Sequence, residues 1–406
     1  MKKTKDNYMM KKIEEIIQIS KGKKPKLISK VLEKGLMPYV DIKAFEQKII
    51  DNYTDGEKCL PCEYGDLLIV CDGSRSGLVG RAVKGYVGST LARIDIDKSV
   101  LPEYIYHFIQ GKYIQLNTSI KGTGTPHLNQ ELLKSFELYV PSLEDQHRIV
   151  TRIEELFSQL DSGVETLKKT KEQLKVYRQA VLKEAFEGEL TKQWRKENKL
   201  NNNWKKTDIN DLIEKDKNAL KAGPFGSSLK KECYTKNGFK IYGQEQVIAG
   251  DEEIGNYYIS EEKYRELITC KVKPQDVLIS LVGTVGKILV LSNNCKPGII
   301  NPRLIKVSLD KSKMMPMFFK YYFESSYLRA LYKEKAHGAT MDVLNKKMIQ
   351  ELPFPWCPIS EQVQVIQEIE SRLSVCDSIE KTIDTALQEA EALRQSILKQ
   401  AFEGGL

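Results

Sequence analysis

The chain contains one long segment twice. Residues 142–190 align without a gap with residues 358–406, so each residue of the first copy has a counterpart 216 positions later. About a third of the aligned positions are identical, against roughly one in seventeen expected from average composition. The pattern Arg-Gln-x-x-Leu-Lys-x-Ala-Phe-Glu-Gly-x-Leu occupies residues 178–190 and again 394–406. A repeat of this length predicts two equivalent modules, and therefore two equivalent things to bind.

Both copies are predicted to be long helices. Apolar residues such as Ile149, Ile153, Leu156 and Leu160 recur three or four positions apart, with charged and amide residues between them. This spacing is typical of a coiled-coil seam. Glycine closes each copy, and about 40 helical residues would form a rod roughly 60–70 Å long. One such helix cannot bury its stripe alone, so the two copies are expected to pair.

The segments between the helices, residues 1–141 and 191–357, have the size of ordinary domains and are β-rich by pattern. Residues 66–73 align with 276–283, and residues 128–129 (Leu-Asn) align with 344–345. A Gly/Pro loop precedes each apolar run. The whole chain is therefore predicted to be a diverged tandem duplication with pseudo-twofold symmetry. Its fold class is α+β, with two β-rich globular domains and two long antiparallel coiled-coil helices, in the order 1–141, 142–190, 191–357 and 358–406.

The net charge alone does not indicate that the chain binds nucleic acid, but the positions of the basic residues along the sequence do. The chain holds 63 Lys+Arg against 55 Asp+Glu, a formal charge of +8, which a charged helix face could explain. Polar, basic, glycine-containing loops recur in both halves, at residues 73–77, 121–127, 227–231 and 301–303. Such loops suit phosphate contacts and hydrogen bonds to base edges. For any single loop an ordinary turn explains the composition equally well, but the recurrence in both halves points to DNA.

The sequence offers little catalytic chemistry. It has neither a phosphate-binding loop of the Gly-x-x-x-x-Gly-Lys-Ser/Thr type nor an Asn-Pro-Pro-aromatic motif of adenine methyltransferases. Its four histidines form no cluster with carboxylates at metal-ligand spacing, and the pair Cys59 and Cys62 has no second pair to match it. We found neither a signal peptide nor a run of 18 apolar residues, so a cytoplasmic location with reduced thiols is expected. The chain is predicted to bind rather than to catalyse, with no metal or cofactor of its own.

The layout resembles the specificity subunit of type I restriction–modification enzymes over the whole chain. The residues that carry the resemblance are Gln146 near the start of the first helix and residues 185–191, Ala-Phe-Glu-Gly-Glu-Leu-Thr, followed by Trp194 and Arg195. The second copy departs from the pattern because the sequence ends at Leu406, before a Thr. In such proteins each variable segment is a target recognition domain that reads one half of a bipartite, asymmetric DNA site.

The resemblance also implies the partners. Modification subunits, which carry S-adenosylmethionine and methylate adenine, would dock on the helices and recognition domains, with two expected per chain. Restriction subunits, which use ATP and Mg²⁺, would join that core. The paired helices would act as spacers that hold the two recognition domains apart. Because a 60–70 Å rod spans about two turns of B-DNA, inserting four residues in one helix is expected to lengthen the gap between the half-sites.

We expect the DNA contacts among polar and basic residues of the two β-rich segments, with the glycine-containing loops as the guide. In the first segment they are Ser74, Arg75, Arg81, Lys84, Arg93, Lys121, Thr123, Thr125 and His127. In the second segment they are Ser227, Ser228, Lys230, Gln244, Lys287, Arg303, His337 and Thr340.

Candidate docking residues are apolar side chains that lie off the predicted seam, with their counterparts in the second copy. They are Phe157, Tyr177, Leu182, Phe186, Leu373, Leu393, Leu398 and Phe402. The same residues could instead cover the neighbouring globular domains.

Two rival functions remain at this point. A coiled-coil adaptor or structural protein with two protein-binding β domains would show no salt-sensitive affinity for DNA. A nucleic-acid enzyme with an unrecognised active site would cut or modify DNA by itself.

Overall fold

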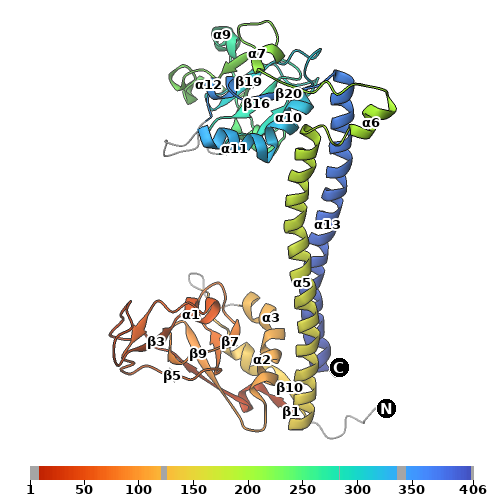
Figure 1. Cartoon of the computed structure of the whole chain (residues 1–406). Helices are drawn as coiled ribbons and strands as arrows, with labels where there is room; N and C mark the ends of the chain where they lie inside the picture. Colours follow the sequence, from red (N-terminus) through yellow and green to blue (C-terminus); the bar gives the residue numbers. More distant parts are fainter. Residues whose placement is uncertain (1–8, 120–125, 283, 336–343, 404–406) are drawn as a thin grey trace. The chain divides into compact units, whose positions relative to one another are not determined.

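The computed structural model describes residues 9–119, 126–282, 284–335 and 344–403. Contacts divide the chain into two units, one made of residues 1–168 and 384–406 and the other of residues 169–383. Unit 1 and unit 2 each combine a β-rich part with one end of each of two long helices (Figure 1).

The β-rich part of unit 1 contains two four-stranded sheets. The first has the order β2-β9-β6-β7 and is antiparallel throughout, and the second has the order β4-β3-β8-β5 with a parallel pair, β3 and β8. A two-stranded ribbon, β1 with β10, joins the ends of the domain. The strands are β1 Met9–Lys12, β2 Ile17–Lys21, β3 Met37–Val40, β4 Tyr53–Thr54, β5 Pro61–Cys62, β6 Leu67–Val70, β7 Val79–Arg81, β8 Gly85–Val87, β9 Leu91–Ile96 and β10 Glu137–Val140. The helices are α1 Ile42–Gln47, α2 Pro102–Gly111, α3 Tyr113–Thr118 and α4 Gln130–Ser135, with a short 3₁₀ turn at Ile13–Glu15.

Strand β6 explains why two sheets can share one domain. Leu67 and Ile69 belong to the core beneath α2, whereas Leu68 and Val70 belong to the core shared with the second sheet. Successive side chains of a strand point to opposite faces, so a continuous apolar run is buried on both sides. The unbroken Leu-Leu-Ile-Val sequence therefore identifies the central strand of a three-layer arrangement.

Unit 2 repeats this plan except at the edges of the second sheet, where β13 pairs with β15 while β5 of unit 1 pairs with β8. Its sheets have the orders β12-β19-β16-β17 and β13-β15-β14-β18, with β14 and β18 parallel, and its ribbon pairs β11 with β20. The strands are β11 Lys205–Thr207, β12 Leu220–Ala222, β13 Tyr234–Thr235, β14 Phe239–Tyr242, β15 Tyr258–Ile259, β16 Val277–Ser280, β17 Ile288–Val290, β18 Gly298–Ile300, β19 Leu304–Val307 and β20 Phe354–Trp356. The helices are α6 Lys192–Glu197, α7 Ile209–Leu212, α8 Gln244–Ala249, α9 Glu261–Glu266, α10 Pro316–Glu324, α11 Ser326–Lys335 and α12 Lys346–Gln350. Short 3₁₀ turns lie at Gly226–Ser228, Lys231–Cys233 and Ile268–Cys270.

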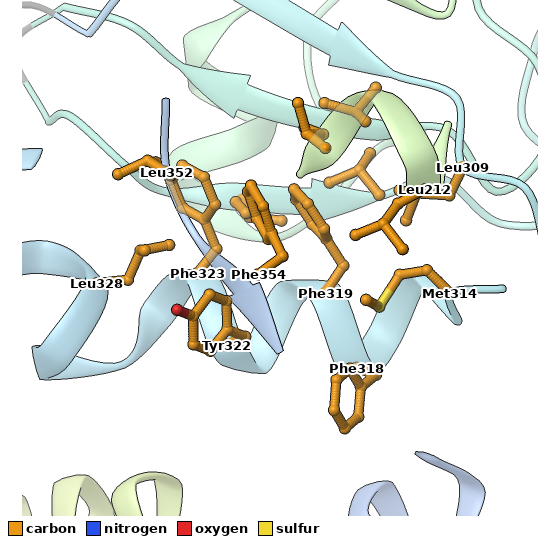
Figure 2. Packing of buried hydrophobic residues seen from close by; sticks show 14 of the residues in the cluster. Leu212, Leu309, Met314, Phe318, Phe319, Tyr322, Phe323, Leu328, Leu352 and Phe354 are labelled. Carbon is orange, nitrogen blue, oxygen red and sulfur yellow. The ribbon is translucent and has the colours of Figure 1, made fainter. Parts of the chain in front are cut away.

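Aromatic side chains fill the core beneath the first sheet of unit 2. Phe319, Phe323 and Phe354 are fully buried, and the rings of Phe319 and Phe354 stack 5.1 Å apart (Figure 2). Leu212, Leu309 and Met314 enclose the same cluster (Figure 2). Rings of this size remove 150–250 Å² each from water and dominate the stability of such a core.

The duplicated segments form α5, Leu143–Phe186, and α13, Ile359–Glu403, of 44 and 45 residues. In unit 1 the start of α5 packs on the end of α13, through Ile153 and Phe157 against Ile397 and Leu398. In unit 2 the end of α5 packs on the start of α13, through Val181 and Ala185 against residues 365–369. The two helices therefore run antiparallel (Figure 1), and the predicted α+β architecture with paired coiled-coil helices is confirmed.

Candidate nucleic-acid interface

Loops at one end of the sheets in unit 1 are joined by backbone hydrogen bonds. The loop after β2 begins with Gly22, whose amide donates to Leu91 at 2.9 Å. The loop after β6 is held by bonds from Cys71 to Thr90 at 2.8 Å and from Gly73 to Pro126 at 2.8 Å. Four chain segments distant in sequence thus meet at this end, and we call them loop cluster 1: residues 22–25, 72–77, 88–90 and 126–127.

Asp72 is the charged centre of loop cluster 1. Its carboxylate accepts from Lys21 Nζ at 2.8 Å and from His127 Nδ1 at 2.7 Å. Burial alone would raise the pKa of Asp72, but the hydrogen bonds from Lys21 and His127 hold that pKa below its ordinary value. His127 is therefore both exposed and anchored, which suits a side chain that contacts a ligand without reorganising.

Ser74 and Arg75 occupy the tip of the loop after β6, and both are exposed. The Ser74 carbonyl accepts from Asn117 Nδ2 at 2.9 Å, so the loop backbone is tied to α3. Arg75 Nη1 lies 2.5 Å from a Glu46 carboxylate oxygen, which raises the pKa of the guanidinium through that hydrogen bond. An exposed ion pair of this kind is weak, so Arg75 can exchange Glu46 for a phosphate or a base.

The structure gives Arg81 and Arg93 internal partners, while their assignment as DNA contacts stays a prediction. Arg81 donates to the Gly65 carbonyl at 3.1 Å and to Glu103 at 3.0 Å. Arg93 donates to the Pro61 carbonyl at 2.7 Å, and its Nε lies 2.9 Å from Asp95. These guanidinium groups complete the packing of the sheet because partly buried charges need partners.

Lys84 lies away from loop cluster 1, in the turn between β7 and β8. Its ammonium group pairs with Glu63 at 3.0 Å, and both side chains are exposed. It remains a basic surface residue, but the structure does not bring it together with the loop that carries Ser74 and Arg75.

Unit 2 builds an equivalent cluster from the same backbone bonds. Gly223 donates to Leu304 at 2.9 Å, and Leu281 donates to Arg303 at 3.0 Å. Leu344 donates to Leu281 at 2.9 Å, just as Leu128 donates to Cys71 at 2.8 Å in unit 1. We call this set loop cluster 2: residues 223–230, 282, 284–287, 301–303 and 344–345, together with Gln244 at the start of α8.

Gln244 and Arg303 form the polar centre of loop cluster 2. The Gln244 amide donates to Ser280 Oγ at 2.7 Å and to the Val282 carbonyl, and its oxygen lies 3.5 Å from Arg303 Nη1. Arg303 is exposed, and its backbone amide donates to Asn301 Oδ1 at 2.9 Å. Two of the predicted DNA-contacting residues are thus brought together, and an amide and a guanidinium are groups that can form hydrogen bonds with base edges.

Four further candidates of unit 2 belong to the chain segments of loop cluster 2. Ser227 and Lys230 are exposed, Ser228 is half-buried, and Lys287 is half-buried beside the turn that follows β16.

Five predicted DNA-contacting residues of the two units lie outside the residues that the structure describes: Lys121, Thr123, Thr125, His337 and Thr340.

Two buried glutamines at equivalent positions of the repeat, Gln146 and Gln362, join the long helices to the β-rich parts. Gln146, fully buried in α5, accepts from the Leu101 amide at 2.8 Å and donates to the carbonyls of Ser99 and Pro141. Gln362 in α13 accepts from the Met315 amide at 2.9 Å and makes the corresponding pair of bonds at 2.8 Å. The repeat revealed the identity of these residues, but sequence reasoning gave them no role.

A second buried polar centre holds the end of the first helix in unit 2. Glu361 accepts from Thr191 Oγ1 at 2.7 Å, from Trp204 Nε1 at 2.7 Å and from Arg195. Arg195 also donates to the Gly188 carbonyl at 2.6 Å. The Gly-x-Leu-Thr-x-x-x-Arg motif therefore has a structural purpose, since each buried charge is paired.

The docking candidates separate into two groups. Phe157, Leu182 and Leu398 are buried inside the chain, at 8%, 5% and 1% exposure, which corrects their assignment to a partner surface. Leu373 is half-buried against the core of unit 2. Tyr177 and its counterpart Leu393 remain exposed, at 45% and 51%.

Phe186 and Phe402 are counterparts that pack on the β-rich parts of their own units. The Phe186 ring lies 5.1 Å from both Phe318 and Tyr322 of α10. Phe402 lies 5.0 Å from Tyr104 and 5.3 Å from Phe108 of α2. These ring contacts attach the helices to the β-rich parts, while both side chains remain half-buried, so their assignment as docking residues stays a prediction.

Each unit has an apolar hollow beside the long helices, and the hollow of unit 1 is lined in part by Leu393. In unit 1 a cavity of about 480 Å³ is lined by Leu160, Val164, Ala390 and Leu393. In unit 2 a cavity of about 670 Å³ lies beside Phe186 and Trp204.

Within the described residues no group of three or more His, Cys, Asp and Glu could hold a metal ion, and no described helix is long and apolar enough to cross a membrane.

Comparison with known proteins agrees with this duplicated architecture. The family model described as type I restriction modification DNA specificity domain matches residues 5–176 and, a second time, residues 201–389. The chain is 24% identical to the EcoBI specificity subunit of Escherichia coli over 84% of this chain and 73% of that protein. It is 26% identical to the StySPI specificity subunit of Salmonella potsdam over 84% of this chain and 74% of that protein.

Solved structures share the fold at 18% sequence identity. A chain from a study of complex assembly and conformational transition of the type I R-M system has a TM-score of 0.74, with 100% of both chains covered. The crystal structure of the HsdS subunit from Thermoanaerobacter tengcongensis has a TM-score of 0.57, covering 100% of this chain and 98% of that one. Because the family model accounts for most of the sequence in two successive matches, the chain belongs to the type I restriction modification DNA specificity family.

Proposed function

We propose that this chain is the non-catalytic DNA-specificity subunit of a type I restriction–modification complex. It binds a bipartite, asymmetric site on double-stranded DNA, with one half-site for each β-rich domain. The single observation that carries the proposal is the pair of loop clusters. Cys71 and Leu281 occupy equivalent places in the same backbone hydrogen-bond frame, yet the exposed side chains on that frame differ between the two halves.

The division of the chain follows from this function. Residues 1–141 and 191–357 are the two target recognition domains, and residues 142–190 and 358–406 are the spacer helices. A common frame with different side chains is what two unrelated half-sites require, since the backbone sets the position of a loop and the side chains select bases.

The partners follow from the same membership. Adenine-methylating modification subunits, two per chain, dock on the helices and the adjoining domains in the cytoplasm, and restriction subunits join them. S-adenosylmethionine, ATP and Mg²⁺ belong to those subunits. Tyr177 and Leu393 support this arrangement, because they are exposed apolar side chains at equivalent positions of the repeat, and Leu393 also lines an apolar hollow.

The test is methylation mapping with the chain and its cognate modification subunits. Genomic DNA from cells that express the complex should carry methyladenine in one motif made of two short specific parts separated by an unspecific spacer. Exchange of residues 191–357 for the corresponding segment of a relative should replace one part and leave the other unchanged. A single continuous motif, or a change in both parts after the exchange, would contradict the proposal.

The docking places can be tested in the same complex. Tyr177→Glu and Leu393→Glu should each remove one modification subunit, measured as a loss of mass by light scattering. Lys175→Glu, on an exposed position of the same helix, is the control and should leave the mass unchanged.

A further inference from the structure

Phe225 is the most exposed large apolar side chain among the residues that the structure describes. Its exposure is 86%, although it lies between Pro224 and Gly226 in the first loop of cluster 2. Apolar surface that stays in water contributes nothing to folding. An aromatic ring held in this position therefore needs an explanation outside the folded domain itself.

The loop that presents Phe225 is anchored at both ends. At one end the Gly223 amide donates to Leu304 at 2.9 Å, and any side chain at Gly223 would collide with the Asn301 backbone. At the other end Leu229 is buried in the core of the second sheet. Because both ends are fixed, the ring projects from a defined position and loses little conformational entropy when it binds.

The loop that carries Phe225 also carries polar and basic side chains and abuts another segment with a basic residue. Gly223 abuts the segment that carries Arg303, and Ser227 and Lys230 follow Phe225 in the same loop. Arg303 in turn contacts Gln244. An exposed aromatic ring among hydroxyl, amide and cationic groups is the combination that proteins use to stack on bases while they bind phosphates.

The corresponding loop of unit 1 supports the same ligand. It begins at Gly22, which makes the equivalent bond to Leu91 at 2.9 Å and approaches the Val87 and Gly88 backbone as closely. Where unit 2 carries Phe225, this loop carries Lys23 and Lys24, both exposed. Lysines on one copy of the loop fit a polyanion, so the same loop faces DNA in both halves while its side chains differ.

We propose that Phe225 is an aromatic wedge that inserts between neighbouring base pairs of the second half-site and unstacks them. This inference rests on the proposed DNA-specificity function and adds a means of shape-dependent recognition to it. Sequence preference then arises from the cost of opening the base step, which is lowest at flexible pyrimidine–purine steps. The domain of unit 1, with lysines in place of the ring, holds its half-site without such a wedge.

The experiment uses the full chain assembled with its modification subunits and duplexes that contain the methylation motif of the complex. 2-Aminopurine replaces one base at a time along the second half-site. Wild type should increase the fluorescence at one step, and Phe225→Ala should abolish this increase and raise the Kd roughly ten- to hundred-fold. Phe225→Trp should restore both, because its larger ring still stacks.

Two matched controls separate a wedge from other roles. Tyr64 is 85% exposed and lies in the turn before β6, at the end opposite to loop cluster 1, so Tyr64→Ala should leave affinity and fluorescence unchanged. Lys230→Ala should reduce the salt dependence of binding by about one charge, whereas Phe225→Ala should leave that slope as it is.

The outcomes are distinguishable. If the wild-type complex does not bind its motif, the proposed function fails. If it binds and Phe225→Ala retains full affinity or the same fluorescence at every step, the wedge is wrong and the function stands. A loss of modification subunits in Phe225→Ala, measured by light scattering without DNA, would also overturn the wedge, because it would assign the ring to a protein contact.

Discussion

Arg178 of α5 donates to Asp377 of α13 across 2.7 Å, and the counterparts of these two residues, Arg394 and Asp161, form the same ion pair with the helices exchanged. Each pair lies within one unit. The repetition shows that the duplicated segments pair with each other through equivalent positions in both units. Arg178 also reaches Glu380 at 3.1 Å, whereas Arg394 lies 4.4 Å from the Phe157 ring.

Reversing the charge of Arg178 alone should destabilise the pairing of the two helices, and reversing the charge of Asp377 as well should restore it. Arg178→Asp places a carboxylate near Asp377 and Glu380, and we expect a loss of about 1 kcal/mol because partly exposed pairs contribute little. The double variant with Asp377→Arg should recover most of that loss. Thermal melting followed by circular dichroism measures both, with Lys175→Asp as the control. If the double variant is no more stable than Arg178→Asp, the two side chains do not interact in solution.

Loss of a buried glutamine should loosen one domain from its helix. Gln146→Leu would leave the Leu101 amide and the carbonyls of Ser99 and Pro141 without their partner. Unsatisfied buried polar groups are costly, so we expect destabilisation by about 2–4 kcal/mol. Urea denaturation should show this loss for Gln146→Leu and for the counterpart Gln362→Leu. Gln159→Leu, on an exposed position of α5, should have little effect, and an equal loss in all three would point to helix propensity instead.

These glutamines show where sequence reasoning reached its limit. The repeat predicted which residues are equivalent, and equivalence alone led to the two helices, their pairing and the duplicated domains. It also matched Asn129 with Asn345, and both side chains cap the start of a short helix, α4 and α12. It could not reveal that the partner of Gln146 is a backbone amide 45 positions earlier, because that contact depends on tertiary packing.

The surroundings of a strand arginine are harder to predict from the sequence. Arg93 is a predicted DNA contact, and in the structure its side chain donates to Pro61 and pairs with Asp95. Lys306 in the equivalent strand of unit 2 is also internal, 3.7 Å from the buried carboxylate of Asp276. Strand residues alternate between faces, and composition does not say which face is covered. Loop residues such as Arg75 were easier to place, because loops lie at the surface.

Acid should weaken loop cluster 1 through Asp72. The folded pKa of Asp72 lies below its ordinary value, so its contribution to stability is fully present above the unfolded pKa of about 3.9 and is lost as the pH falls through the folded pKa. Asp72→Asn should therefore be less stable than wild type near neutral pH, and the difference should shrink below about pH 4. Urea midpoints measured from pH 7 to pH 3 test this. A difference that grows toward low pH would mean that Lys21 and His127 do not stabilise the carboxylate.

Arg75 and Glu46 offer a test of the first half-site. Because the guanidinium is exposed and is held by Glu46 at 2.5 Å, Arg75→Ala should raise the Kd for target DNA roughly five- to hundred-fold, as expected for a lost base or phosphate contact. Glu46→Gln should release the guanidinium and leave binding equal or tighter. Fluorescence anisotropy with the assembled complex measures both, and Lys84→Ala is the control. If Arg75→Ala retains full affinity, Arg75 does not belong to the interface.

Lengthening both helices should lengthen the spacer of the DNA motif without changing its specific parts. Each of α5 and α13 is continuous through its whole length, so an insertion cannot be absorbed by a loop. Because the helices pair antiparallel, we expect the longer pairing to need matched insertions, after Lys168 and after Ile383. Seven residues preserve the apolar seam and add about 10 Å, or about three base pairs at 3.4 Å each. Methylation mapping of the variant should then show the same two half-sites with a longer gap. An unchanged gap together with full methylation would mean that the helices do not set the distance at which the two domains read DNA.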